Sequence, residues 1–261
     1  SHTVTNILKT SFKNTWILKE IEFRTKNSYI DNILPLKAGD NSYIEPFLIG
    51  FSYTRLPSDT QNKLLERIIK FSQNLSSTKI VKKDSLHYAL ERKNYALELL
   101  KKRLYRVYYD FKPIIDAFLE FATSVNNFEI FIEMSHGDFQ KGNIFYTLDN
   151  QLYVLDWETP GMRIKHYDLI TFFNNTRNSN NSVKFVKNVC QNSEISLGGT
   201  NIIEDSTYSY LKLFLLEDFI WQIEESEILD ENMTSTGLKN YIKFIPEIIK
   251  TVDRMSEKHD K

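Results

Sequence analysis

The residues best suited to chemistry in this sequence are two aspartates and one asparagine at short spacing. Asp138 and Asn143 lie five residues apart in one polar stretch, and Asp156 follows thirteen residues after Asn143. A divalent cation such as Mg²⁺ prefers oxygen ligands and keeps several of its waters, so one carboxylate and one amide oxygen suffice when phosphate oxygens complete the shell. Asn143 and Asp156 fit that role. Asp138 fits the role of a carboxylate that accepts the proton of an attacking hydroxyl, and together these roles are those of phosphoryl transfer.

Three apolar stretches and a turn must position these side chains. Residues 128–134 are rich in Phe, Ile and Met, which predicts a buried strand that runs into the polar loop. Residues 143–146 and 151–157 predict two short strands, and the sequence Leu148-Asp149-Asn150 between them predicts a hairpin turn. Because a hairpin returns the chain to the end of that loop, we expect the two carboxylates and the amide to converge on one point.

Two motifs in this region resemble those of a known superfamily. The sequence SHGDFQKGN, which ends at Asn143, is similar to the catalytic loop of the aminoglycoside phosphotransferase and choline kinase-like superfamily, distant relatives of protein kinases. The sequence VLDWE, residues 154–158, looks like the metal-binding strand end of that superfamily. The resemblance implies a small-molecule kinase that moves the γ-phosphate of ATP to a hydroxyl with the help of Mg²⁺. It implies that Asp138 is catalytic and that Asn143 and Asp156 are the metal ligands.

The resemblance also implies an α+β, protein kinase-like fold. Residues 1–52 would form a small mixed N-terminal lobe on the nucleotide side, and residues 53–261 a larger, mainly helical C-terminal lobe with the catalytic loop and the metal site. Apolar residues at helical spacing predict helices over residues 16–34, 59–74, 86–109, 113–125, 167–173, 183–190, 208–228 and 239–255. This order, with few strands first and helices last, agrees with that fold.

A lysine and a glutamate near the N-terminus are expected to help hold the nucleotide, because kinases of this fold pair a strand lysine with a helix glutamate. We favour Lys9, at the end of a strand predicted over residues 3–8, together with Glu22 in the first predicted helix. The alternatives for this pair are Lys13, Lys19 and Glu20.

The adenine ring is expected to bind at the next strand. Residues 43–53 resemble the strand that joins the two lobes and hydrogen-bonds adenine through its backbone, so Phe51, Ser52 and Tyr53 would line the adenine pocket. Lys141 in the catalytic loop is a candidate contact to a phosphate. The polar residues 76–84 that follow the second helix predict a loop.

One expected motif is missing from the sequence. Kinases cover the phosphates with a Gly-rich loop before the lysine, but the first glycine is Gly39 and no G-x-G-x-x-G occurs; the pair Gly198-Gly199 predicts a turn. We expect that the sequence begins after the first strands of the small lobe; a glycine-free loop and a degenerate nucleotide site are the alternatives. The last of these would make the protein a pseudokinase or a nucleotide-binding module without catalysis.

The sequence departs from protein kinases in ways that favour a small acceptor. Gly137 and Gln140 stand where a protein kinase has an arginine and a lysine, and only eleven residues separate Asp156 from Asp168, with no APE motif. Because little chain is left to dock a peptide, we expect a small-molecule hydroxyl acceptor such as an aminoglycoside, an amino alcohol or a sugar. Acidic residues of the predicted helix 208–228 favour a cationic acceptor; they are Glu217, Asp218, Glu224 and Glu225.

Composition excludes several other classes of protein. The net charge of −1 gives no nucleic-acid footprint, and the single cysteine, Cys190, excludes an internal disulfide framework. No apolar run approaches the roughly 18–20 residues of a membrane span, and no signal-peptide pattern opens the chain. We therefore expect a cytoplasmic, helix-rich protein that binds neither nucleic acid nor membrane.

Overall fold

The structure is a computed structural model that describes residues 6–10, 14–40, 42–177, 179–192, 194–197, 200–202, 207–228 and 236–259. The chain divides into two compact units, of which the first comprises Ser1–Ile80 and Glu133–Arg163 and the second Val81–Ile132 and Ile164–Lys261. This division differs from the boundary predicted after residue 52, because the segment after that residue and the 143–157 hairpin pack with the N-terminal segment.

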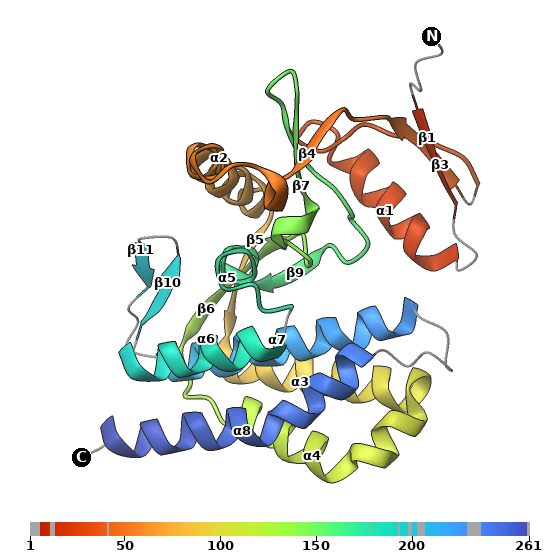
Figure 1. Cartoon of the computed structure of the whole chain (residues 1–261). Coiled ribbons are helices and arrows are strands. Elements are labelled where there is room, and N and C mark those ends of the chain that lie inside the picture. Colours follow the sequence, from red (N-terminus) through yellow and green to blue (C-terminus); the bar gives the residue numbers. More distant parts are fainter. Residues whose placement is uncertain are drawn as a thin grey trace. The chain divides into compact units, whose positions relative to one another are not determined.

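The first unit begins with a small antiparallel sheet and one helix. Strand β1 (Asn6–Thr10), helix α1 (Asn14–Lys26), and strands β2 (Lys37–Ala38) and β3 (Ser42–Pro46) follow in order, and the sheet has the order β1-β3-β2 (Figure 1). In the register of β1 and β3, Lys9 lies opposite Tyr43. Successive side chains of a strand alternate between its two faces, so Glu45, two residues after Tyr43, lies on the same face of the sheet as Tyr43 and Lys9.

A second sheet holds the predicted hairpin. Strand β4 (Gly50–Ser52) pairs with β7 (Ile144–Thr147), and β7 pairs with β8 (Leu152–Val154). A Cβ on Gly50 would lie 2.1 Å from the carbonyl oxygen of Tyr146, so only glycine permits this close approach. The single strand predicted over residues 43–53 is therefore wrong: β3 and β4 belong to different sheets, and residues 47–49 join them.

Helix α2 completes the first unit. It spans Ser58–Ser77 after the short helix η1 (Tyr53–Arg55), and its buried stripe includes Leu64, Ile68 and Phe71. Phe71 stacks on Phe139 with ring centroids 5.9 Å apart, which joins α2 to the loop of Asp138. The helix predicted over residues 59–74 is confirmed.

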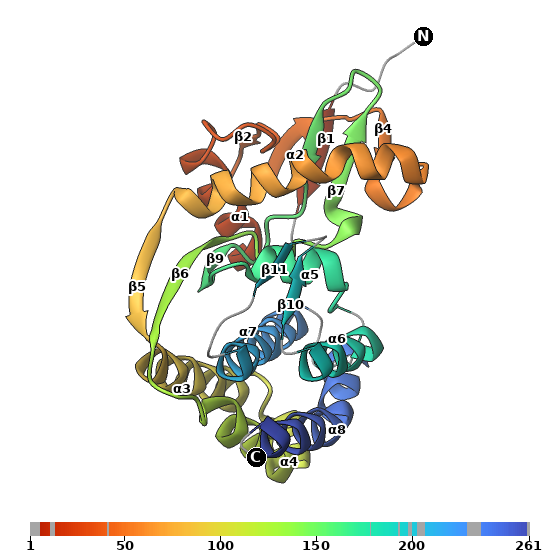
Figure 2. The same ribbon diagram turned by 90° about the vertical axis from the view of Figure 1, so that its left-hand side faces the viewer.

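The second unit is mainly helical. Its helices are α3 (Ser85–Arg103), α4 (Tyr105–Thr123), α5 (Tyr167–Asn174), α6 (Ser179–Asn192), α7 (Thr207–Ile228) and α8 (Thr236–His259), and a hairpin is formed by β10 (Ile195–Leu197) and β11 (Thr200–Ile202). Figure 2 shows α3, α4, α6, α7 and α8 gathered around a shared core, to which α7 contributes the buried Phe214, Phe219 and Ile220. The α+β class with a helical larger part is thus confirmed.

Three further local predictions were wrong. The helix predicted over residues 16–34 ends at Lys26. The predicted loop over residues 76–84 contains a strand, β5 (Ile80–Asp84), which forms a sheet of order β5-β6-β9 with β6 (Glu129–Ser135) and β9 (Gly161–Ile164). The helix predicted over 86–109 ends at Arg103 instead, because Leu104 leaves the helical conformation at φ −127° and ψ 42°. Pro113, where the next helix was predicted to begin, lies inside α4, where it forgoes one backbone hydrogen bond.

Among the described residues no helix is long and apolar enough to cross a membrane.

Candidate active site

The loop after β6 requires a glycine. Gly137 has φ +88°, and a Cβ there would lie 2.0 Å from the carbonyl oxygen of Thr159 and 2.8 Å from Nη1 of Arg163. Arg163 Nη1 in turn donates to the Thr159 carbonyl at 3.0 Å, so the guanidinium fills the space that a side chain at 137 would need. The difference from protein kinases at this position thus has a steric cause: no arginine can stand there.

His136 connects the loop to the end of β8. Its Nδ1 accepts a hydrogen bond from the backbone N–H of Asp138 at 3.2 Å, and its Nε2 lies 3.0 Å from the carbonyl oxygen of Leu155. Because a backbone N–H donates to Nδ1, Nε2 is the ring nitrogen assigned as the donor to the Leu155 carbonyl. The ring is fully buried and lies 4.3 Å from the Trp157 ring. His136 therefore braces the loop against the end of β8.

Asp138 is oriented by two side-chain amides. Its Oδ2 accepts hydrogen bonds from Asn143 Nδ2 and from Gln140 Nε2, each at 2.9 Å, and its backbone carbonyl accepts a second bond from Asn143 Nδ2 at 3.0 Å. Both acceptors demand a donor, so the nitrogen of the Asn143 amide must face Asp138 and its Oδ1 must face away from it. Asn143 can thus hold the carboxylate with one end of its amide and offer oxygen to a cation with the other.

Asp156 reaches the same place from the end of β8. Its backbone lies in the left-handed region at φ 68°, a conformation that non-glycine residues adopt at an energetic cost and that is found preferentially at functional sites. Burial raises the pKa of the Asp156 carboxyl; nearby Lys9 opposes that shift, while Glu20 and Asp138 add to it. The charges of Lys9 and of both acids therefore act on Asp156, and the structure brings these groups together in the first unit.

The donor set at this point suits magnesium. Mg²⁺ favours oxygen ligands from one or two carboxylates together with substrate phosphates and water, and Asp156 supplies a carboxylate while Asn143 supplies an amide oxygen. Within the described ranges no group of three or more His, Cys, Asp or Glu residues could hold a metal ion.

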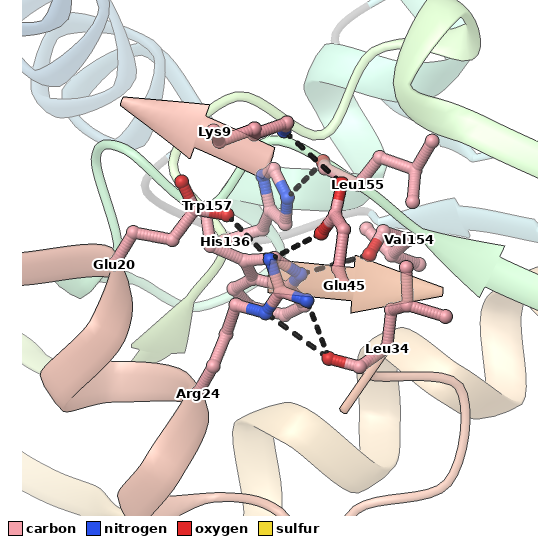
Figure 3. Close-up of polar contacts among 9 residues, drawn as sticks. All are labelled: Lys9, Glu20, Arg24, Leu34, Glu45, His136, Val154, Leu155 and Trp157. Carbon is pink, nitrogen blue, oxygen red and sulfur yellow. Dashed lines mark hydrogen bonds and ion pairs between the residues drawn. The ribbon is translucent and has the colours of Figure 1, made fainter. Parts of the chain in front are cut away.

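The predicted pairing of Lys9 with Glu22 is wrong. Lys9 Nζ lies 3.6 Å from Oε1 of Glu45, a residue of β3 (Figure 3). The Glu22 side chain is 65% exposed and forms a salt bridge with Lys26 at 2.6 Å. Glu20, one of the alternatives, is buried beside Arg24. Of the other two, Lys19 is exposed and Lys13 lies outside the described residues, as do Gly198 and Gly199.

The remaining residues predicted to contact the nucleotide differ in how far they are exposed to solvent. Phe51 on β4 is 52% exposed, and Ser52 next to it is half-buried. Tyr53 is buried, and its hydroxyl donates to the carbonyl oxygen of Gln61 at 3.4 Å, so its side chain takes part in the packing of α2. Lys141 begins the short helix η2 (Lys141–Asn143) and is half-buried.

Two of the four acidic residues of α7 that were expected to favour a cationic acceptor are paired inside the second unit. Glu217 and Asp218 are fully buried, and each is neutralised by an arginine: Arg92 Nη2 lies 2.7 Å from Glu217, and Arg177 pairs with Asp218. Glu224 accepts a hydrogen bond from the Tyr95 hydroxyl at 2.8 Å. Glu217 and Asp218 therefore belong to the core of the second unit and give no support to a cationic acceptor.

Sequence reasoning missed two buried charges near the site. Arg24 and Glu45 are both buried, and Arg24 Nη1 lies 2.8 Å from Glu45 Oε2. The sequence held one signal for the burial of Arg24: it is adjacent to Phe23, an apolar residue of the helix. Phe23 stacks on Trp157 with ring centroids 4.9 Å apart.

A separate cavity of about 660 Å³ in the first unit is lined by residues 28–35, by α2 and by β8, and none of the predicted site residues lines it.

Solved structures match this chain, whereas no protein-family model and no curated protein matches its sequence. Choline kinase LicA from Streptococcus pneumoniae is 14% identical, with a TM-score of 0.58 over 96% of this chain and 88% of that chain. A thermostable mutant of aminoglycoside phosphotransferase APH(4)-Ia, in complex with ADP and hygromycin B, is 10% identical, with a TM-score of 0.60 over 94% and 86% of the two chains. ADP-bound aminoglycoside phosphotransferase APH(2'')-Ib is 14% identical, with a TM-score of 0.51 over 96% and 88%.

At such identities the likeness establishes the fold alone. The matches agree with the fold that the resemblance of the SHGDFQKGN and VLDWE motifs implied, and in the match to choline kinase LicA they cover 96% of the chain. This chain has the protein kinase-like fold that is shared by choline kinase and aminoglycoside phosphotransferase structures.

Proposed function

We propose that this protein is an ATP- and Mg²⁺-dependent kinase that phosphorylates a hydroxyl group of a small molecule. The observation that supports this proposal most is the convergence of an amide-oriented acid, Asp138, with an amide and carboxylate pair, Asn143 and Asp156. The positive charge of Lys9 acts on the Asp156 carboxylate and opposes the rise of its pKa. The structural neighbours include a choline kinase and aminoglycoside phosphotransferases with bound ADP, which agrees with this chemistry.

Each residue has a distinct task in the proposed reaction. Asn143 Oδ1 and the Asp156 carboxylate would hold Mg²⁺, which supplies charge neutralisation on the phosphates when it is bound. The Asp138 carboxylate orients the acceptor hydroxyl and takes its proton as the acceptor oxygen bonds to the γ-phosphorus and the bond to ADP breaks. The Asn143 and Gln140 amides fix Asp138 in one orientation, so the base does not have to be ordered during the reaction.

The nucleotide would be held by groups of the first unit. Lys9 is the proposed phosphate cation, and Lys141 is a second candidate because it stands in the loop that carries Asn143. Phe51 and Ser52 are the proposed neighbours of the adenine ring, since both are accessible on β4. Tyr53 and Glu22 are left out of the proposal, the first because it packs in the core and the second because it pairs with Lys26 in solvent.

The first test of this function is a thermal-shift titration with ATP, in the presence of Mg²⁺ and in the presence of a chelator. A ligand that binds the folded state stabilises it by mass action and so raises the unfolding midpoint. The free energy of unfolding rises by roughly 2.7 kcal/mol when the ligand concentration is 100 times Kd. We expect a larger rise with Mg²⁺ than with the chelator. A panel of aminoglycosides, choline-like amino alcohols and sugars, assayed for acceptor-dependent ADP formation, then identifies the acceptor class.

The second candidate function is a nucleotide-binding module without catalysis. It is favoured by one observation, that no G-x-G-x-x-G motif occurs among the eight glycines. Binding of ATP without any dependence on Mg²⁺, and without ADP formation with any acceptor, would support this second function and remove the first.

A further inference from the structure

Four charged side chains of alternating sign form a line through the first unit. Lys9 Nζ lies 3.6 Å from Glu45 Oε1, Arg24 Nη1 lies 2.8 Å from Glu45 Oε2, and the same nitrogen lies 2.8 Å from Glu20 Oε1. Figure 3 shows Glu45 between Lys9 and Arg24. Since the line contains two cations and two anions, it is neutral as a set, which is the condition for burying charge at tolerable cost.

Arg24 is the fixed centre of this line. Its side chain is 2% exposed, and both Nε and Nη2 donate to the carbonyl oxygen of Leu34, at 3.1 and 2.6 Å. Burial alone would lower the pKa of Arg24, but the carboxylates of Glu20 and Glu45 outweigh it, so the pKa is raised and the guanidinium stays charged. A planar fork whose nitrogens are directed to a backbone carbonyl and two carboxylates has a single orientation.

Lys9 is the open end of the line. Its side chain is 40% exposed, whereas that of Glu45 is 7% exposed. The Lys9 and Arg24 cations both approach the ring of the buried Tyr43, at 5.6 and 5.0 Å from its centroid. The carboxylate beside Lys9 is thus anchored in the core, while the ammonium group remains within reach of a ligand.

We propose that Glu45, a residue of β3, orients Lys9 toward the nucleotide phosphates in place of a glutamate of α1, and that Arg24 is the positioning residue that holds Glu45. This inference rests on the proposed function, because it assigns the partner of the phosphate-binding lysine. It differs from the kinase pattern, in which a helix glutamate contacts the lysine directly. Here the described contacts connect the helix to the lysine through Arg24 and Glu45.

The alternative partner, Glu20, is already committed. Its Oε1 accepts from Arg24, and Glu20 is buried. If Glu20 turned to Lys9, a guanidinium that is 2% exposed would lose one of its two carboxylates. Leaving a buried charge with too little compensation is strongly unfavourable. The Glu45 arrangement satisfies both cations at once.

The test compares isosteric variants in a calorimetric measurement of ATP binding, without acceptor, so that the readout is affinity rather than turnover. Glu45→Gln keeps the volume of the side chain but removes the charge that faces Lys9, and we expect ATP binding to weaken roughly tenfold. Glu20→Gln should weaken it clearly less. The matched control is Glu22→Gln, an exposed residue of the same helix, which should leave affinity unchanged.

The order of these effects decides the inference. A loss in Glu20→Gln as large as that in Glu45→Gln, with wild type binding ATP, would overturn the inference and leave the proposed function standing. No ATP binding by the wild type would remove both. If Glu45→Gln fails to fold, Glu45→Asp and the double variant Lys9→Arg with Glu45→Asp replace it. The longer arginine should restore affinity lost by the shorter aspartate, a rescue that a purely structural role would not produce, and its absence would overturn the inference.

Discussion

Both units bury charged side chains, but the two sets end differently. In the first unit the line of charges begins in the core at Glu20 and ends at Lys9, which is 40% exposed. In the second unit the pairs of Glu217 with Arg92 and of Asp218 with Arg177 place their carboxylates at 0% exposure. The second set has no end as accessible as Lys9, because the Arg92 and Arg177 side chains are 19% and 6% exposed.

This difference separates charge that can act on a ligand from charge that only specifies the packing. The Asp218 and Arg177 pair is enclosed, and the Arg177 guanidinium lies 3.6 Å from the centroid of the Trp221 ring, so no ligand can replace either partner without opening the core. Lys9 lies 3.6 Å from the Glu45 carboxylate and is 40% exposed, so it can keep that partner and still be open to a further anion. Buried charge alone is therefore a poor guide to a site, and the accessible end is the useful feature.

The largest effect that would test this comparison is expected at Asp138. Replacing it with alanine removes the proposed proton acceptor, so turnover with the correct acceptor should fall by about 10²–10⁴-fold. The fold should persist, because Asp138 is only half-buried and the Asn143 amide keeps its bond to the backbone carbonyl of residue 138. Steady-state ADP formation and the urea midpoint measure the two effects.

Asp149→Ala is the matched control for that variant, since Asp149 is an exposed acid in the turn of the nearby β7–β8 hairpin. It should change neither turnover nor midpoint. Unchanged turnover in Asp138→Ala would remove the assignment of the base.

The next largest effect is expected from opening the sealed set. Arg177→Met leaves the fully buried Asp218 without its cation, and breaking a buried pair in this way costs about 3–5 kcal/mol of unfolding free energy. Urea unfolding at 25 °C measures the loss. ATP affinity, measured well below the unfolding midpoint, should not change, which distinguishes this pair from the line that ends at Lys9.

A double variant sharpens that result. Replacing Asp218 with leucine in the Arg177→Met background removes the uncompensated charge, so most of the lost stability should return. A double variant less stable than Arg177→Met would show that the pair contributes mainly through other contacts.

A smaller, pH-dependent effect is expected at His166, the N-cap of α5. Burial, with a contribution from Lys165, lowers the pKa of His166 to about 4, whereas an unfolded histidine titrates near 6.5. Between these values the unfolded chain binds a proton that the folded chain does not, so the stability present above about pH 6.5 is lost as the pH falls toward 4. The full loss is at most about 2–3 kcal/mol, because the side chain is partly exposed.

His166→Asn tests this sign, because asparagine tolerates the left-handed conformation at φ 66°. Urea midpoints at pH 7 and pH 4.5 should differ less in the variant than in the wild type. An equal drop in both proteins would assign the acid sensitivity to other groups.

The sequence was enough to expect the loop and hairpin of the candidate site, because the geometry of that region is local. Asp138, Asn143 and Asp156 are brought together by one loop and one hairpin, so spacing and turn chemistry were enough to expect their convergence. The partner of Lys9 was not local: it depends on the register of β1 against β3 and on which face of α1 turns inward. Positions 20 and 22 of a helix point roughly 160° apart, and the weak apolar period of residues 16–34 did not reveal which of them is buried. Non-local pairing also hid the ion pairs of Glu217 with Arg92 and of Asp218 with Arg177, because both arginines lie outside α7.

The smallest effect is expected from Glu22→Gln, and its smallness is informative. Glu22 is 65% exposed, and its bond to Lys26 spans one turn of α1 in solvent, where salt screens the attraction and the two side chains lose freedom to hold it. The unfolding midpoint and the ATP affinity of the variant should both match those of the wild type. A measurable loss of ATP affinity would mean that α1 turns Glu22 toward the nucleotide when ATP binds, which would make the helix itself, rather than Glu45, the element that positions Lys9.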